Sequence, residues 1–263
     1  GLIIKEIKEN TWEVLLQSNR RLKENESLTF DNSVKGKILY RNDTGSWIIR
    51  VEDKGKFAEM LKNSGRMPLP PYIKRDSNDE TEGIHDDERY QTIYAEKMGA
   101  IAAPTAGLHF TTNLLQEISR KGIKIVYITL HVGLGTFKPI HTEDLRQHTI
   151  HKEFYNIPEE TTDTINKAKS LGKKIFATGT STCRVLETIA KNNTTGKSSG
   201  WTNLFIYPPY KFKLTDSLIT NFHLQRSTLI LLASAFAGRE NIATSYEEAI
   251  SLNYRFYSYG DCM

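Results

Sequence analysis

The sequence is short of cysteine and has no long apolar run. Its 263 residues include two cysteines, Cys183 and Cys262, whose different contexts argue against a disulfide framework and are typical of a reducing cytosol. No CxxC pair occurs, which disfavours a thiolate zinc site. No stretch approaches the roughly 18 apolar residues that span a bilayer, and the N-terminus lacks the pattern of a signal peptide. We therefore expect a soluble, cytoplasmic protein with no membrane partner.

Common motifs of metal and nucleotide sites are also missing. Neither HxH nor HExxH is present, and the pair His148 and His151 has no obvious third ligand, so we expect no metal. The sequence lacks both a P-loop and a GxGxxG fingerprint. A net charge of +4, from 35 basic and 31 acidic residues, is compatible with a polyanionic partner but does not demonstrate one.

The hydrophobic pattern changes near Gly65, where we place a domain boundary between residues 1–65 and 66–263. From Leu2 to about Val51, short alternating runs separated by Asn, Asp, Gly and Lys predict a small antiparallel β domain. A short helix ending at Gly65 follows. Beyond it the pattern predicts a mixed α/β domain. Its expected helices cover 112–121, 160–170, 183–192, 227–238 and 245–253, and its expected strands cover 123–132, 173–178, 204–207, 216–224 and 254–259.

Two glycine-containing blocks, AAPTAGLHFT at 102–111 and TLHVGLGTFKP at 129–139, each place a histidine beside a turn. About one βαβ unit separates them. Such spacing would bring both turns to the same edge of a parallel sheet, where open α/β folds bind ligands. The blocks therefore predict two walls of one pocket.

Three further groups of residues could carry chemistry. The run Thr178 to Thr182 offers hydroxyls and backbone amides at the start of a helix, which suits an anion or ribose hydroxyls, or equally a plain helix cap. His109, His131 and His223 could act as acid/base groups, as metal ligands, or as structural histidines. Lysines and arginines interleaved with tyrosines could hold a phosphate backbone and stack bases, or could simply be surface residues.

Eight ordered segments carry a family resemblance that runs from about Thr11 to Met263. They are MPLPPYIKR, ERYQTIYA, GAIAAPTAGLHFT, TLHVGLGTFKPI, GTSTCRVLE, GWTNLFIYPPYKFK, DSLITNFHLQRSTLILLASAFAG and YRFYSYGD. In this order they resemble the S-adenosylmethionine:tRNA ribosyltransferase-isomerases of queuosine biosynthesis. The resemblance implies an α/β catalytic domain with a smaller antiparallel β-barrel domain inserted. It also implies that family members have a further stretch before the β-rich part, supplying the first strands of the catalytic domain.

The same resemblance implies a reaction. The ribosyl unit of S-adenosylmethionine moves to a 7-aminomethyl-7-deazaguanine at the tRNA wobble position, giving epoxyqueuosine and releasing adenine and methionine. S-adenosylmethionine is consumed as a co-substrate, and no metal or other cofactor is implied. The sulfonium acidifies the adjacent ribose 5′ carbon, so a positioned base could remove its proton and start the loss of adenine. The alternatives are a metal-dependent hydrolase using the histidines as ligands, and a noncatalytic tRNA-binding module.

For this reaction the sequence predicts three sets of site residues. Expected catalytic groups are His109, His131 and His223 as candidate bases, with Asp261, if protonated, as a possible donor to adenine. Expected contacts to the S-adenosylmethionine donor are Gly107, Gly133, Gly135, Thr136, Thr180, Ser181 and Arg184. Expected contacts to tRNA are Arg75, Arg89, Tyr90, Tyr207, Tyr210, Lys211, Lys213 and Arg226. The sequence leaves open which histidine is the base and what the oligomeric state is.

Overall fold

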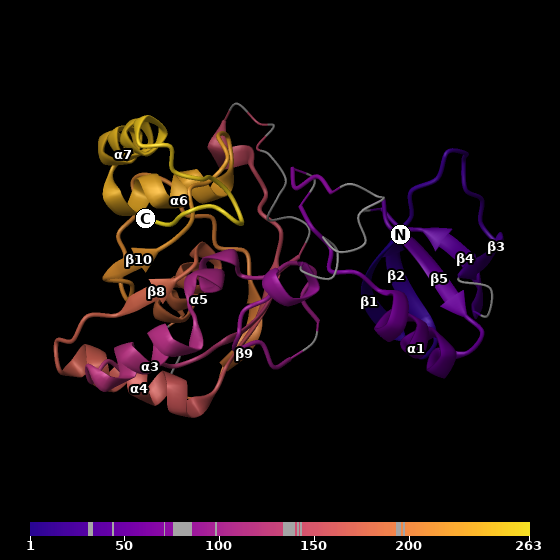
Figure 1. The fold of residues 1–263 in the computed structure, drawn as a ribbon, viewed down its shortest axis with the longest axis horizontal. Helices are drawn as coiled ribbons and strands as arrows, with labels where there is room; N and C mark the ends of the chain where they lie inside the picture. Colours follow the sequence, from indigo (N-terminus) through magenta and orange to yellow (C-terminus); the bar gives the residue numbers. More distant parts are fainter. Residues whose placement is uncertain are drawn as a thin grey trace. The chain divides into compact units, whose positions relative to one another are not determined.

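The computed structural model describes residues 1–263 except 31–33, 44, 71, 76–85, 98, 134–139, 141, 143, 193–195 and 197. The chain divides into two compact units, Gly1–Pro68 and Leu69–Met263 (Figure 1). Each has its own buried core. Within the described ranges, no helix is long and apolar enough to cross a membrane.

The N-terminal unit is built on a five-stranded antiparallel sheet with strand order β1-β2-β5-β4-β3. Its strands are β1 (Leu2–Lys8), β2 (Thr11–Leu15), β3 (Ser27–Phe30), β4 (Val34–Arg41) and β5 (Trp47–Val51). Alternate residues of β4 are buried from Val34 to Ile38, as expected for a sheet with one face on a core. The edge strands are β1 and β3, and no pairing joins them among the described residues, so the barrel that the family resemblance implies is not found closed here.

One helix, α1 (Lys54–Ser64), completes this unit. Asp53 caps it by accepting a hydrogen bond from the Lys56 amide at 3.0 Å, and Gly65 ends it as expected. The fully buried Phe57 of α1 packs with Trp12 and Phe30 at ring-centroid distances of 5.4 Å. Burial of this apolar face supplies the main stabilisation of the sheet.

The C-terminal unit mixes helices with two small sheets, which confirms the α/β class. A three-stranded antiparallel sheet has the order β6-β7-β9, and a parallel pair joins β10 to β8. The strands are β6 (Thr129–His131), β7 (Glu153–Ile157), β8 (Phe176–Thr178), β9 (Ser198–Thr202) and β10 (Ser217–Ile219). The helices are η1 (Thr105–His109), α3 (Thr112–Arg120), η3 (Leu145–Gln147), α4 (Glu159–Ser170), α5 (Thr180–Lys191), α6 (Thr228–Ala237) and α7 (Arg239–Ser251).

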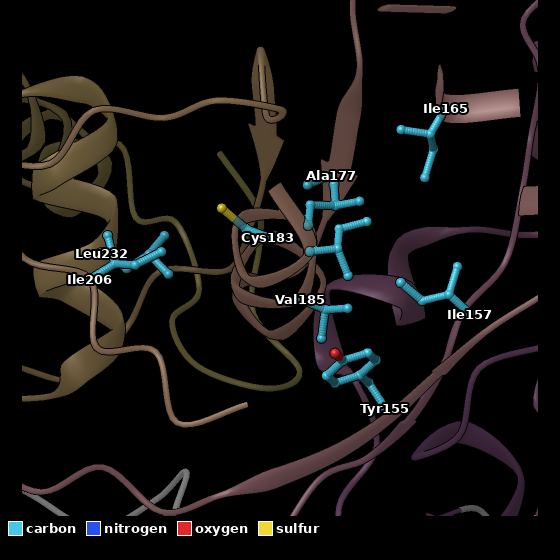
Figure 2. Close-up of a cluster of buried hydrophobic side chains, with 10 residues drawn as sticks. Tyr155, Ile157, Ile165, Ala177, Cys183, Val185, Ile206 and Leu232 are labelled. Carbon is cyan, nitrogen blue, oxygen red and sulfur yellow. The ribbon is translucent and has the colours of Figure 1, made fainter. Parts of the chain in front are cut away.

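Helix α5 lies at the centre of the core of this unit. Figure 2 shows Cys183 and Val185 of α5 with Ile206 and Leu232 on one side and Tyr155 on the other. Eight of the twelve residues of α5 are buried. The helix is therefore held on several sides, and the loop that precedes it is fixed in place.

The predicted helices are confirmed where strong caps mark them. Thr111 caps α3 through a 3.2 Å bond from the Leu114 amide, and Ser227 caps α6 through a 3.3 Å bond from the Ile230 amide. The predicted strands 204–207 and 254–259 are wrong, since neither segment joins a sheet. Aromatic and β-branched residues there pack on helices instead, and strand propensity is decided by such context.

The predicted parallel edge for the two glycine blocks is also wrong. The first block forms the 3₁₀ helix η1, and the second begins with β6, which pairs antiparallel with β7. The residue just before the first block bonds to the second block, because the Ile101 amide donates to the Val132 carbonyl at 3.0 Å. The parallel pair of the described strands is β8 with β10.

Candidate active site

The carboxyl ends of β8 and β10 form the edge at which α/β folds place ligands. Gly179, with φ +90°, follows β8 and donates its amide to the Ile219 carbonyl at the end of β10, at 2.9 Å. A Cβ on Gly179 would lie 3.7 Å from the Cβ of Ala106, so η1 lies beside this edge. Three segments distant in sequence therefore meet here: η1, the start of α5 and the loop after β10.

Asn221, two residues beyond β10, connects these segments to the C-terminus. Its side chain is buried, and its Nδ2 lies 3.0 Å from Nε2 of His109 and 3.1 Å from the Tyr257 carbonyl. Its Oδ1 accepts a bond from the Thr105 hydroxyl at 3.3 Å. A backbone bridge also pairs Asn221 with Cys262. One buried amide thus fixes His109 and the last residues of the chain together.

This contact decides which nitrogen of His109 carries the proton. A carbonyl oxygen only accepts, so the Asn221 atom beside the Tyr257 carbonyl must be the amide nitrogen, which donates. The same nitrogen then donates its second proton to Nε2 of His109, which must accept. Burial also lowers the pKa of His109, with smaller opposing effects from Asp261, which raises it, and Arg255, which lowers it. His109 is therefore a neutral imidazole with its proton on Nδ1.

Asp261 lies near His109 but is ionised, which corrects its predicted role. Arg255 donates to it from the backbone amide at 2.8 Å and from Nη2 at 2.9 Å. These hydrogen bonds hold the pKa of the Asp261 carboxyl below its ordinary value. A carboxylate cannot donate a proton at neutral pH, so Asp261 is not a donor to adenine in this arrangement.

Thr180 and Ser181 form the first turn of α5 at the same edge. Both are buried, and the preceding Gly179 has no side chain to cap the helix. Among the described residues, no N-cap side chain therefore bonds to the first amides of α5, at the positive end of the helix. Position and polarity agree with a role in holding an anionic or hydroxyl group of a substrate.

His131 lies in the three-stranded sheet, at the end of β6. Its ring packs edge-on against Phe154 at a centroid distance of 5.4 Å. A Cβ on Gly99, whose φ is +134°, would overlap the His131 ring, so only glycine allows this contact. Within the described part of the chain no hydrogen bond reaches either ring nitrogen of His131, and no contact joins it to His109. Among the described residues, the lone pair of the His131 ring therefore accepts no hydrogen bond.

His223 is held by its own loop. Its Nε2 lies 2.7 Å from the Thr220 hydroxyl, and its backbone amide donates to the Tyr246 hydroxyl at 2.6 Å. Burial lowers the pKa of His223 to about 4. A histidine of such low basicity accepts a proton poorly, so the structural role is the better interpretation of His223.

The depressed pKa of His223 predicts a pH dependence of stability. Between its folded pKa of about 4 and an unfolded value of about 6.5, only the unfolded chain binds the proton, so the free energy of unfolding falls as pH falls. We expect His223 to account for a loss of about 2 kcal/mol between pH 7 and pH 5. Denaturant unfolding of the wild type and of His223→Gln at both pH values checks this. Equal losses in the two proteins would contradict it.

Arg184 is engaged inside the protein, which corrects its predicted contact with the methionine carboxylate. It forms an ion pair with Glu153, and both side chains are buried. Its Nε donates to the Leu204 carbonyl at 2.9 Å. This pair links α5 to β7, and Arg184 therefore holds the core of the unit together.

The predicted glycine contacts have different outcomes. A Cβ on Gly107 would overlap the Tyr94 hydroxyl and Cγ2 of Thr92, so Gly107 makes room for protein side chains and not for a ligand. A Cβ on Gly133 would meet no atom of the described residues within 4 Å, so packing within this part of the chain does not require glycine there. Gly135 and Thr136 lie outside the described residues.

Tyr90 is fully buried, which removes it as a stacking partner for a base in this arrangement. Its hydroxyl lies 3.0 Å from the Ser258 hydroxyl, and its ring packs edge-on against Tyr259 at 5.3 Å. Burial raises the pKa of Tyr90 well above its ordinary value. The ring has no free face for a nucleotide.

Arg75 and Arg89 flank the same cluster. Arg75 donates to both carboxylate oxygens of Asp86, at 2.7 and 2.9 Å, and this pair lowers the pKa of Asp86. The guanidinium groups of Arg75 and Arg89 each lie 5.9 Å from the Tyr259 ring centroid. Arg75 is thus committed to Asp86, whereas Arg89 is exposed and compatible with a phosphate contact.

The loop that carries Tyr210, Lys211 and Lys213 is organised by a buried carboxylate. Glu187 of α5 is fully buried and accepts bonds from the amides of Lys213, Leu214 and Thr215 at 2.8, 3.0 and 3.0 Å. Tyr210 packs on the core beside it, and burial raises its pKa to about 12. Like Arg89, the predicted tRNA contacts Lys211, Lys213 and Arg226 are exposed, and Tyr207 is half-buried against Phe205.

Comparison with known proteins gives this arrangement a family. The model of a family described as queuosine biosynthesis protein matches residues 2–263. The chain belongs to this family. A relative from Acetivibrio thermocellus, named S-adenosylmethionine:tRNA ribosyltransferase-isomerase, is 49% identical over 264 residues, which cover 100% of this chain and 75% of that protein. A relative of the same name from Finegoldia magna is 48% identical over 257 residues, covering 97% of this chain and 72% of that protein.

A solved structure agrees with the queuosine biosynthesis assignment. The crystal structure of an S-adenosylmethionine tRNA ribosyltransferase from Thermotoga maritima is 31% identical and has a TM-score of 0.51. The match covers 99% of this chain and 72% of that one. Among the described residues, no group of three or more His, Cys, Asp or Glu side chains could hold a metal ion.

Sequence reasoning missed three residues that organise this member of the queuosine biosynthesis family. Asn221, Glu187 and Gly99 each act on a predicted group: Asn221 on His109, Glu187 on the Lys211–Lys213 loop, and Gly99 on His131. The sequence could have identified Asn221 from its position, since polar residues near the carboxyl end of a strand in an α/β domain often contact ligands. No local pattern marks the other two, since their partners are distant in sequence.

Proposed function

We propose that this protein transfers and isomerises the ribosyl moiety of S-adenosylmethionine onto 7-aminomethyl-7-deazaguanine at the wobble position of tRNA. The products are epoxyqueuosine in tRNA, adenine and methionine. The observation that carries the proposal is 49% identity over the whole chain to a relative named for this enzyme activity. This likeness favours the transferase over a metal-dependent hydrolase or a noncatalytic tRNA-binding module. S-adenosylmethionine is a consumed co-substrate, no further cofactor is needed, and the reaction takes place in the cytoplasm.

The donor binds at the carboxyl edge of β8 and β10 in this proposal. Burial and position support Thr180 and Ser181 as contacts, and the free amides at the start of α5 suit the methionine carboxylate. Because Arg184 is paired with Glu153, the carboxylate relies on the helix end and not on that arginine.

His109 serves as a hydrogen-bond donor. Nε2 accepts a hydrogen bond from the Asn221 amide. A proton added to Nε2 would point at the amide N–H, which disfavours His109 as a base at this atom. Nδ1, in contrast, carries a proton that can bond to the adenine nitrogen on which negative charge develops as the glycosidic bond breaks. Asn221 is then a positioning residue, because it fixes the ring and its tautomer without touching the substrate.

His131 is the better candidate for the base. Its ring nitrogens have no hydrogen-bond partner among the described residues, so a lone pair is free to take the proton from the ribose 5′ carbon beside the sulfonium. Loss of adenine opens the sugar, the amine of the deazaguanine captures it, and ring closure expels methionine. Exposed Lys211, Lys213 and Arg226 offer positive charge to tRNA phosphates.

Release of adenine tests the function. The full protein is incubated with S-adenosylmethionine and tRNA bearing the aminomethyl deazaguanine, and free adenine is measured by chromatography. We expect adenine only with the modified tRNA, and the same yield with added chelator. Folded protein that releases no adenine contradicts the transferase, and loss of activity with chelator favours the hydrolase.

A further inference from the structure

The N-terminal unit contains a pocket that the proposed reaction leaves without a role. The pocket has a volume of about 700 Å³ and is lined by residues of the loop after β2 and by Arg41 and Trp47 at the facing ends of β4 and β5. This volume lies within the range of ligand sites in proteins. All its lining residues belong to Gly1–Pro68.

Positive charge is concentrated in this pocket. Four of its lining side chains are basic, namely Arg20, Arg21, Lys23 and Arg41, and one is acidic, Glu24. Arg20 is paired with Glu26. In the part of the chain that the structure describes, no ion pair engages Arg21 or Arg41, so their charges are available to an anion.

The distribution of charge along the chain points the same way. Gly1–Pro68 carries 13 Lys or Arg against 10 Asp or Glu, and Leu69–Met263 carries 22 against 21. The first unit therefore holds +3 of the net +4 in about a quarter of the residues. A basic pocket within a basic unit attracts polyanions over a distance set by ionic strength.

An aromatic platform lies on the wall of the pocket. The Arg41 guanidinium lies 5.5 Å from the Trp47 ring centroid, and its Nε donates to the Gly45 carbonyl at 3.1 Å. The bond and the cation–π contact with the ring hold this guanidinium in place. A planar guanidinium backed by an indole can accept an unpaired base by stacking while it contacts a phosphate.

We propose that this pocket of the N-terminal unit is an RNA-docking site that binds backbone phosphates of the tRNA substrate. The occupant is RNA because clustered arginine with one aromatic platform suits repeated phosphates beside unpaired bases. This inference rests on the proposed function for the identity of the RNA. It assigns to the β-rich unit a role in substrate affinity that is separate from the catalytic residues.

Charge reversal inside and outside the pocket tests the proposal. Arg21→Glu combined with Lys23→Glu changes two exposed pocket residues, and Lys56→Glu combined with Lys62→Glu changes two exposed lysines of α1 by the same net charge. The Kd for tRNA is measured by fluorescence anisotropy from 50 to 300 mM salt. We expect the pocket variant to bind tRNA at least tenfold more weakly than wild type. The dependence of its log Kd on log salt concentration should be shallower, by about one released ion. The α1 variant should bind within about twofold of wild type.

Each outcome decides between defined possibilities. At saturating tRNA the pocket variant should keep the wild-type rate of adenine release, because the catalytic residues are unchanged. Equal weakening in both variants overturns the pocket, since it indicates a general charge effect. If the pocket variant binds tRNA as tightly as wild type but no longer binds AMP, the RNA assignment is overturned. That result indicates a site for a small anion. Failure of the wild type to release adenine, with tRNA binding still lost in the pocket variant, contradicts the proposed function and keeps the docking site.

Discussion

Replacing His109 with alanine is expected to lower the rate of adenine release by about 100- to 1,000-fold at saturating donor and tRNA. A fixed donor to a developing negative charge contributes on this scale because it needs no reorganisation during the reaction. The tRNA Kd and the unfolding temperature should change little, because the ring is half-buried and makes a single hydrogen bond among the described residues. Single-turnover adenine release, tRNA binding and thermal unfolding measured together check this.

Two further variants separate catalysis from structure at His109. His148→Ala is the matched control, since that ring packs on Phe205 and no contact connects it to the Asn221 cluster in the described residues; it should keep wild-type turnover. Asn221→Asp replaces the donor at Nε2 with an acceptor, so it should raise the pKa of His109 and move its proton from Nδ1 to Nε2. Turnover should then fall even though the ring is present. Wild-type turnover in His109→Ala would overturn the donor role.

Replacing Arg184 with alanine is expected to destabilise the protein by about 3–5 kcal/mol, because it removes the cation that forms the buried ion pair with the Glu153 carboxylate. For a unit of this size the unfolding temperature should fall by about 10 °C. Well below that temperature, KM for S-adenosylmethionine should stay within about twofold of wild type. Calorimetry and steady-state kinetics on the same sample check both parts.

A second variant distinguishes the two interpretations of Arg184. Combining Arg184→Met with Glu153→Gln removes both charges, so the double variant should be more stable than the sum of the two single changes predicts. An unchanged unfolding temperature in Arg184→Ala, with KM for S-adenosylmethionine raised tenfold, would instead show that Arg184 binds the methionine carboxylate.

The sequence predicted the helices better than the strands, for a physical reason. Thr111 and Ser227 cap their helices through local hydrogen bonds, and such bonds depend on residues three positions apart. The segment 254–259 has the composition of a strand but follows a turn at Asn253, where φ is +57°, and packs its aromatic rings on α7. Its conformation depends on distant partners, which a local pattern does not contain.

The same limit applies to the candidate site. The sequence identified His109, Thr180 and Ser181, which lie at one edge around Asn221 and the start of α5. It assigned Arg184 and Tyr90 to substrates because residue type alone does not reveal burial. The tautomer of His109 required the position of an amide 112 residues away in sequence. Long-range contacts of this kind decide which candidate residues can contact a substrate and which are buried inside the protein.

The central claim is that this chain moves the ribosyl group of S-adenosylmethionine to tRNA and that the His109–Asn221 pair assists the departure of adenine. The most direct measurement uses donor labelled with ¹³C in the ribose and deuterium in the methyl group, followed by mass spectrometry of nucleosides from digested tRNA. We predict that wild-type protein places the ribose label alone in the wobble nucleoside and that His109→Ala does so at least 100-fold more slowly. Methyl label in the tRNA, or equal rates of ribose transfer in both proteins, would contradict the account.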